Sequence, residues 1–111
     1  MKLETKMLPG DITVVSLKGE LNYNTSEEAR ESMMSVVENN RNVVIDMEDC
    51  TYVSSSGLRV LLLLGKRSRQ LGENIALVNL NEEVRDVMEM TGFGTIFNCY
   101  DNLDTAAAAM A

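Results

Sequence analysis

Hydrophobic and polar residues alternate along the first part of the chain, which is the pattern of strands with one buried face. Leu3–Met7 and Ile12–Lys18 both follow this pattern. The turn between them contains Pro9-Gly10, where proline presets one turn dihedral and glycine accepts a positive φ. The pattern therefore predicts an N-terminal β-hairpin, followed by a loop over residues 19–24.

The spacing then changes to that of a helix. Thr25 and Glu28 fit a capping box, in which the Thr25 hydroxyl binds first-turn amides and the Glu28 carboxylate reaches back. Asn39-Asn40 ends this helix, whose apolar face consists of Ala29, Met33, Val36 and Val37. The β-branched run Val43–Ile45 that follows predicts a strand buried on both faces.

A second helix is predicted from a cluster of serines to about Leu71, just before Gly72. We expect Ser55 or Ser56 to cap it. The apolar run within it indicates that this helix is well buried. Ile75–Val78 is the next short buried strand.

The last third of the chain predicts two more helices and an edge strand. Asn81 is expected to cap a helix that carries Val84, Val87 and Met88 and ends at Gly92. Ile96–Cys99 is the expected edge strand. Asp101 is expected to cap a terminal helix with Leu103 and Ala106–Ala109, which has high helix propensity but little to pack against.

The predicted order of elements is therefore β-β-α-β-α-β-α-β-α. Strands that are joined through helices lie parallel. We expect an α/β fold with a mixed, mostly parallel β-sheet, an N-terminal β-hairpin and about four helices. The 111 residues are enough for one core, so residues 1–111 are expected to form a single domain.

Charge excludes some classes of partner. Ten Lys and Arg against seventeen Asp and Glu give a net charge of −7, which repels phosphate backbones and anionic lipids, so we expect no direct nucleic acid and no membrane partner. The longest apolar run, Val60–Leu64, is far shorter than the ~20 residues of a membrane span. The N-terminal residues lack the apolar stretch of a signal peptide, which predicts a cytoplasmic location.

The chain contains no histidine, which excludes Ser-His-Asp and Cys-His catalysis and any imidazole-ligated metal within it. Cys50 and Cys99 are far apart in the sequence and are expected to be free, buried thiols. Asp46 and Asp49 follow a strand, where Asp46 is expected to bond nearby amides and hold the loop rather than bind metal. We therefore expect no metal and no cofactor.

One segment could carry chemistry. Ser54, Ser55 and Ser56 are consecutive hydroxyls at the predicted N-terminus of a buried helix, followed by Gly57. Free amides and the helix dipole at such a position attract an anion. Serines at a helix start also commonly do no more than cap it. The residues alone leave both interpretations open: a cap, or a site for an anion or for phosphorylation.

Three stretches occur together with a characteristic spacing: Leu17-Lys18-Gly19-Glu20-Leu21, Val44-Ile45-Asp46-Met47 and Ser55-Ser56-Gly57-Leu58. They resemble the glycine loop, the central strand with its terminal aspartate and the phosphoacceptor motif of STAS domains, specifically of the bacterial anti-sigma factor antagonists. The resemblance covers nearly the whole chain.

The resemblance implies a regulatory partner switch without enzymatic activity. The unmodified antagonist binds an anti-sigma factor that is a serine kinase, and the sigma factor is displaced. The kinase then phosphorylates the first hydroxyl of the motif, the complex dissociates, and a PP2C-type phosphatase resets the switch.

Each residue role is implied by position in the motif. Ser55 would be the phosphoacceptor, and Ser54, Ser56 and Gly57 would form the loop and helix cap. The partner surface would consist of Asn22, Tyr23, Asn24, Leu58 and Arg59.

The sequence departs from the family pattern at three of these positions. The family usually has aspartate where Ser54 and Asn22 stand, and often has glycine where Arg59 stands. The first two departures remove two negative charges from the expected docking surface. Arg59 could meet a phosphate on Ser55, although an ordinary exposed helix residue is the simpler interpretation.

Two other functions are weighed against the switch. In one, the chain is a non-phosphorylated STAS subunit of a transport complex or another multiprotein complex, and Ser55 only caps a helix. In the other, it is a small hydrolase that uses Ser55, which would need a lysine or carboxylate as base. Lys66, the nearest lysine in sequence, is about three turns down the helix at its wrong end, which argues against the hydrolase.

Overall fold

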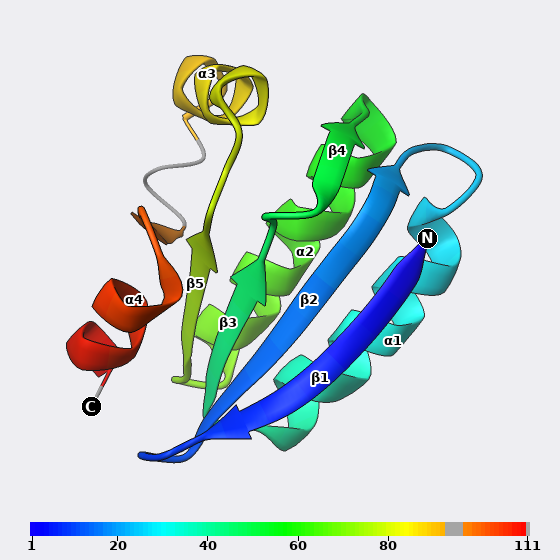
Figure 1. The fold of residues 1–111 in the computed structure, drawn as a ribbon. Helices are drawn as coiled ribbons and strands as arrows, with labels where there is room; N and C mark the ends of the chain where they lie inside the picture. The colour runs from blue at the N-terminus through cyan, green and yellow to red at the C-terminus, as the bar shows by residue number, and fades with distance from the viewer. Residues whose placement is uncertain (93–96, 111) are drawn as a thin grey trace.

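A computed structural model describes residues 1–92 and 97–110 of the chain (Figure 1). Helices and strands alternate over most of its length, as expected for an α/β fold. In chain order the elements are β1 (Lys2–Leu8), β2 (Ile12–Leu21), α1 (Ser26–Asn39), β3 (Asn42–Asp46), β4 (Cys50–Val53), α2 (Ser55–Gln70), β5 (Asn74–Val78), α3 (Glu82–Met90), β6 (Asn98–Tyr100) and α4 (Leu103–Met110).

The strands form a mixed sheet in the order β1-β2-β3-β5-β6. β1 and β2 are an antiparallel hairpin, and β2, β3, β5 and β6 are parallel neighbours. β2 is long enough to pair twice, with β3 along residues 12–16 and with β4 along residues 19–21. The mixed, mostly parallel sheet and its N-terminal hairpin are thereby confirmed, as are four helices within the described part of the chain.

Helices cover both faces of the sheet, but unequally (Figure 1). α1 and α2 lie side by side on one face and enclose the larger core, with Leu17, Ile45 and Leu61 fully buried. α4 lies on the opposite face, where Ala106 is buried in a second core with Val44. The prediction that the terminal helix has little to pack against is therefore wrong, because alanine is small enough to let α4 approach the sheet closely.

Two strand predictions are corrected by the structure. β2 continues three residues beyond Lys18, to Leu21, and Cys50–Val53 forms β4, for which no strand was predicted. The two segments pair with each other in parallel. Neither has a clear alternation of apolar and polar residues, so it is the partner strand that makes each one a strand. Ile96 of the predicted edge strand lies outside the described residues, and β6 comprises Asn98–Tyr100.

The predicted cap of α1 is wrong. Thr25 makes no side-chain cap bond to the helix. Its hydroxyl instead donates to the Glu20 carbonyl at 2.8 Å and accepts from the Asn22 amide at 2.9 Å. The hydroxyl is thus occupied in closing the preceding loop, and the capping box with Glu28 does not form.

The cap predicted for α3 is confirmed, whereas the cap predicted for α4 is wrong. Asn81 caps α3, accepting from the Val84 amide at 2.8 Å, as expected. At α4 the Asn102 side chain, not that of Asp101, accepts from the Thr105 amide at 2.9 Å. Asp101 instead forms an ion pair with Arg85.

The two thiols are free, as predicted. Cys50 is buried in the core, whereas Cys99 is exposed on β6, so the expectation of two buried thiols is wrong for Cys99. Asp46 accepts hydrogen bonds from the Glu48 amide and the Asn79 side chain, each at 3.0 Å. Its predicted role in holding the loop after β3 is confirmed.

Candidate functional site

β4 delivers the chain to the N-terminus of α2, and the three serines lie at this junction (Figure 1). Ser54, rather than Ser55 or Ser56, is the N-cap: its Oγ accepts from the Gly57 amide at 3.2 Å. The Ser54 amide donates to the Leu21 carbonyl at 2.9 Å, and the Ser54 carbonyl accepts from the Leu58 amide at 2.9 Å. Ser54 therefore ties the start of α2 to the end of β2.

Gly57 lies where α2 passes closest to the sheet. A Cβ at this position would lie 2.6 Å from the Leu21 carbonyl oxygen, 2.8 Å from Leu21 Cγ and 3.0 Å from Val53 Cγ1. Such distances are shorter than ordinary van der Waals contact, and a backbone oxygen cannot move aside without moving the strand. Glycine thus allows the first turn of α2 to rest directly on the ends of β2 and β4.

Ser55 begins α2 and is exposed, whereas Ser56 is half-buried. Amides of a first helical turn have no partner within the helix, and the dipole there favours negative charge. In the described part of the chain, the amides of Ser54 and Gly57 are bonded to the Leu21 carbonyl and the Ser54 hydroxyl. The Ser55 and Ser56 amides are the remaining first-turn donors at this end of α2, where an anion is favoured.

The loop between β2 and α1 is held by its own side chains. Asn22 Oδ1 accepts from the amides of Asn24 at 2.9 Å and Thr25 at 3.2 Å. Asn22 is half-buried in this network, whereas Tyr23 is 83% exposed. The residues predicted to bind a partner from this loop therefore differ in role, because Asn22 shapes the loop and Tyr23 and Asn24 are accessible.

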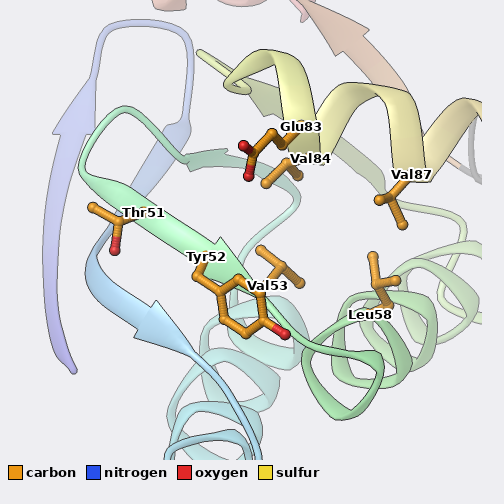
Figure 2. A pocket seen from close by; sticks show the side chains of 7 residues that line it. All are labelled: Thr51, Tyr52, Val53, Leu58, Glu83, Val84 and Val87. Carbon is orange, nitrogen blue, oxygen red and sulfur yellow. The ribbon is translucent and has the colours of Figure 1, made fainter.

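A small apolar cleft opens between β4, α2 and α3 (Figure 2). Leu58 of α2 and Val87 of α3 point toward each other across it, and the Glu83 carboxylate lies near Val84 on α3. Tyr52 and Val87 remain 48% and 39% exposed. This cleft can receive an apolar side chain of a partner.

A larger groove, of about 540 Å³, lies between the N-terminal halves of α1 and α2. Arg59 is exposed on the α2 side, and Tyr23 belongs to the loop that precedes α1. We refer to it as the α1–α2 groove; it is lined by Tyr23, Asn24, Ser26, Glu27, Arg30, Ser56, Arg59, Val60 and Leu63.

The predicted site residues thus meet at one end of the molecule but are divided between two hollows. Tyr23, Asn24 and Arg59 line the α1–α2 groove, and Leu58 lines the apolar cleft. Ser55 comes three residues before Leu58 and four before Arg59, so on a helix it neighbours both. Its position lets a modification of Ser55 affect contacts on either side.

Sequence reasoning missed Tyr52, Val87 and Leu63, which expose apolar surface at the two hollows. Val87 was assigned to the apolar face of its helix, but that face is defined by the buried pair Val84 and Met88. Tyr52 lies on the strand that was not predicted. The partial exposure of these side chains depends on neighbouring elements, so only the three-dimensional arrangement could identify them.

Among residues 1–92 and 97–110, no helix is both long enough and apolar enough to cross a membrane. Within those same residues, no three His, Cys, Asp or Glu side chains gather in a way that could hold a metal ion.

Residues 3–106 match the family of the STAS domain. The match covers nearly the whole chain, including the strands of the sheet and the serine-glycine start of α2. The chain belongs to the STAS domain family.

Two bacterial relatives are similar to this chain over most of its length. BtrV of Bordetella bronchiseptica, described as a candidate anti-sigma factor antagonist, is 36% identical over 110 residues, which cover 98% of this chain and 94% of BtrV. The anti-sigma F factor antagonist of Paenibacillus polymyxa is 30% identical over 93 residues, covering 82% of this chain and 80% of the relative.

Solved structures share the fold. An anti-sigma factor antagonist from Mycobacterium paratuberculosis superposes with a TM-score of 0.89 at 23% identity, covering 98% of this chain and 92% of that one. The Bacillus cell fate determinant SpoIIAA in its phosphorylated form superposes with a TM-score of 0.75 at 19% identity, covering 97% of each chain.

Proposed function

We propose that this STAS protein is an anti-sigma factor antagonist that works by partner switching. In the unmodified state it binds a serine-kinase anti-sigma factor, which releases a sigma factor. Phosphorylation of Ser55 by that kinase ends the complex, and a PP2C-type phosphatase restores the unmodified state. The protein itself is a binding module and not an enzyme.

The observation that carries this proposal is the position of Ser55. Its hydroxyl is exposed on the first turn of α2, next to Leu58 at the apolar cleft and Arg59 at the α1–α2 groove. A kinase can reach the hydroxyl, and a partner that contacts the flanking hollows must also cover it.

Phosphorylation would break such an interface by charge. A phosphate adds about −1.5 to −2 charges to a chain of net charge −7. Burying this charge under a partner, beside the apolar side chain of Leu58, carries a desolvation cost. The start of α2 is anchored to β2 through Ser54, so we expect the modification to act on the surface and not to refold the domain.

The two departures from the family pattern are compatible with this proposal. Ser54 supplies the oxygen that caps α2, and Asn22 supplies the oxygen that closes the loop. Aspartate at either position could accept the same hydrogen bonds. The local geometry is therefore retained while two charges are lost, so we expect the partner's docking surface to be less basic than that of a typical kinase in this family.

The names of its relatives support the proposal. The Paenibacillus relative is an anti-sigma F factor antagonist, and SpoIIAA has been solved in unphosphorylated and phosphorylated forms. The proposal carries these properties over to this chain on the strength of the Ser55 position.

The test is to purify the tagged protein from its native host, in growing and in stressed cells, and to combine intact mass with phosphopeptide mapping. We expect a phosphate on Ser55 and a co-purifying histidine-kinase-like ATPase. Ser55→Ala should hold the kinase persistently and Ser55→Asp should bind it weakly. Ser32→Ala, which changes an exposed serine on α1 outside both hollows, is the matched control that still switches.

Equal binding by Ser55→Ala and Ser55→Asp would remove Ser55 from the mechanism. The absence of phosphate under both conditions, with a stable membrane-transport partner instead, would favour the non-phosphorylated subunit of a transport complex. Catalytic activity that disappears in Ser55→Ala would favour the hydrolase.

A further inference from the structure

The α1–α2 groove differs in charge from the rest of the surface near Ser55. The chain carries a net charge of −7, and Glu83 lies at the apolar cleft on α3. The groove instead contains two arginines, Arg30 from α1 and Arg59 from α2, against one carboxylate, that of Glu27, so its lining has one excess positive charge. A hollow with this charge attracts a negatively charged segment in an otherwise acidic protein.

The two arginines are not equivalent. Arg30 Nη2 lies 2.6 Å from Glu27 Oε1 within the same helix, so its charge is largely balanced, and this pair lowers the pKa of Glu27. Arg59 has no ion-pair or side-chain hydrogen-bond partner among the described residues. An unpaired guanidinium at the edge of a groove offers several donors that match a carboxylate.

The groove also exposes apolar surface. Tyr23 is 83% exposed and Leu63 is 40% exposed, while Val60, which also lines the groove, is buried. Tyrosine and arginine are the residue types that most often carry binding energy in protein interfaces. Tyr23 and Arg59 therefore form a pair of anchors, one for an apolar side chain and one for a carboxylate.

We propose that the α1–α2 groove is a docking site for an acidic segment of the partner protein, in which an aliphatic or aromatic side chain packs on Tyr23 and Leu63 and a neighbouring carboxylate pairs with Arg59. This inference rests on the proposed function, because the same partner would cover Ser55. The groove, which carries Arg59, would be a second contact surface beside the apolar cleft, which carries Glu83. Contacts at both surfaces would fix the partner's orientation.

The test uses the unmodified full chain and a phage library of random short peptides. Peptides are selected on the immobilised protein, and their Kd is measured for wild type, Arg59→Glu and Tyr23→Ala by fluorescence polarisation. We expect enriched peptides to combine Asp or Glu with a large apolar residue. We expect Arg59→Glu to weaken them about tenfold or more, because a charge-assisted pair becomes a like-charge repulsion.

Lys66→Glu is the matched control, because it makes the same charge change on the same helix outside the groove. It should leave the Kd nearly unchanged. Failure to enrich acidic sequences, equal binding to Arg59→Glu and wild type, or equal weakening by Lys66→Glu would each overturn the proposal. The selection needs neither a kinase nor a phosphate on Ser55, so its failure is distinguishable from failure of the switch.

Discussion

Gly57 is the residue in the serine motif with the least room for change. Its missing side chain allows α2 to begin against the Leu21 carbonyl, which a Cβ would approach to 2.6 Å. We expect Gly57→Ala to lower the free energy of unfolding by about 1–3 kcal/mol, as overpacking does elsewhere. Urea denaturation followed by circular dichroism measures this change.

Ser55→Ala is the control for that experiment. Ser55 is exposed and lies on the same turn, so its substitution should change the free energy of unfolding by no more than about 0.5 kcal/mol. If Gly57→Ala proves as stable as Ser55→Ala, the close approach of α2 to β2 is not required.

At the residue scale, the sequence indicated which chemical groups were available but not how they were used. The three serines at the start of α2 were evident, but the choice of Ser54 as the cap depends on where the chain leaves β4. Threonine is a residue type that commonly caps helices. The Thr25 hydroxyl nevertheless donates to the Glu20 carbonyl, because the loop folds back onto β2.

At the scale of elements, α3 is the shortest of the three helices that line the two hollows. It has nine residues and buries Val84 and Met88, and the Asn81 side chain caps its first turn. We expect Asn81→Ala to destabilise this turn by about 1 kcal/mol, which corresponds to about fivefold faster amide exchange in α3. Hydrogen exchange followed by mass spectrometry measures it.

Asn81→Asp should keep slow exchange, because a carboxylate also accepts from the Val84 amide and suits the helix dipole. Amides of α1, which Figure 1 shows on the far side of α2 from α3, serve as the internal reference. Unchanged exchange in α3 of Asn81→Ala would mean that packing alone holds this helix.

The elements that were predicted correctly have a strong local pattern. The hairpin alternates over several residues, β3 contains the β-branched run Val43–Ile45, and β5 contains the apolar run Ile75–Val78. β4 has only four residues, two of them exposed, so no periodicity can develop. It is a strand because the end of β2 lies beside it, which is information from residues about thirty positions away.

At the scale of the whole molecule, the two thiols report on the integrity of the fold. Burial raises the pKa of both thiols above the ordinary value, but Cys50 is only 3% exposed, whereas Cys99 is exposed. Since a reagent must reach the sulfur before the thiolate can react, we expect Ellman's reagent to modify only Cys99 rapidly in the native protein. Cys50 should react at the rate of unfolding.

A raised pKa in the folded state also sets the direction of the pH dependence. The unfolded chain loses the Cys50 proton first as the pH rises, so the folded state should lose stability above the ordinary thiol pKa. Cys99→Ser should show no rapidly reacting thiol, and two rapidly reacting thiols in wild type would contradict the buried position of Cys50.

The sequence by itself determined the fold class, most of the strands and helices, and the serine-glycine motif that places the chain among STAS domains. These features depend on residues that are close together along the chain, where alternation, helix spacing and glycine chemistry act locally. The tertiary structure alone decided that Ser54 caps α2, that β4 pairs with β2, and that Ser55 lies between an apolar cleft and a groove with Arg59. Those features arise from contacts between distant segments, because a hollow and its charge exist only once separate elements pack against each other.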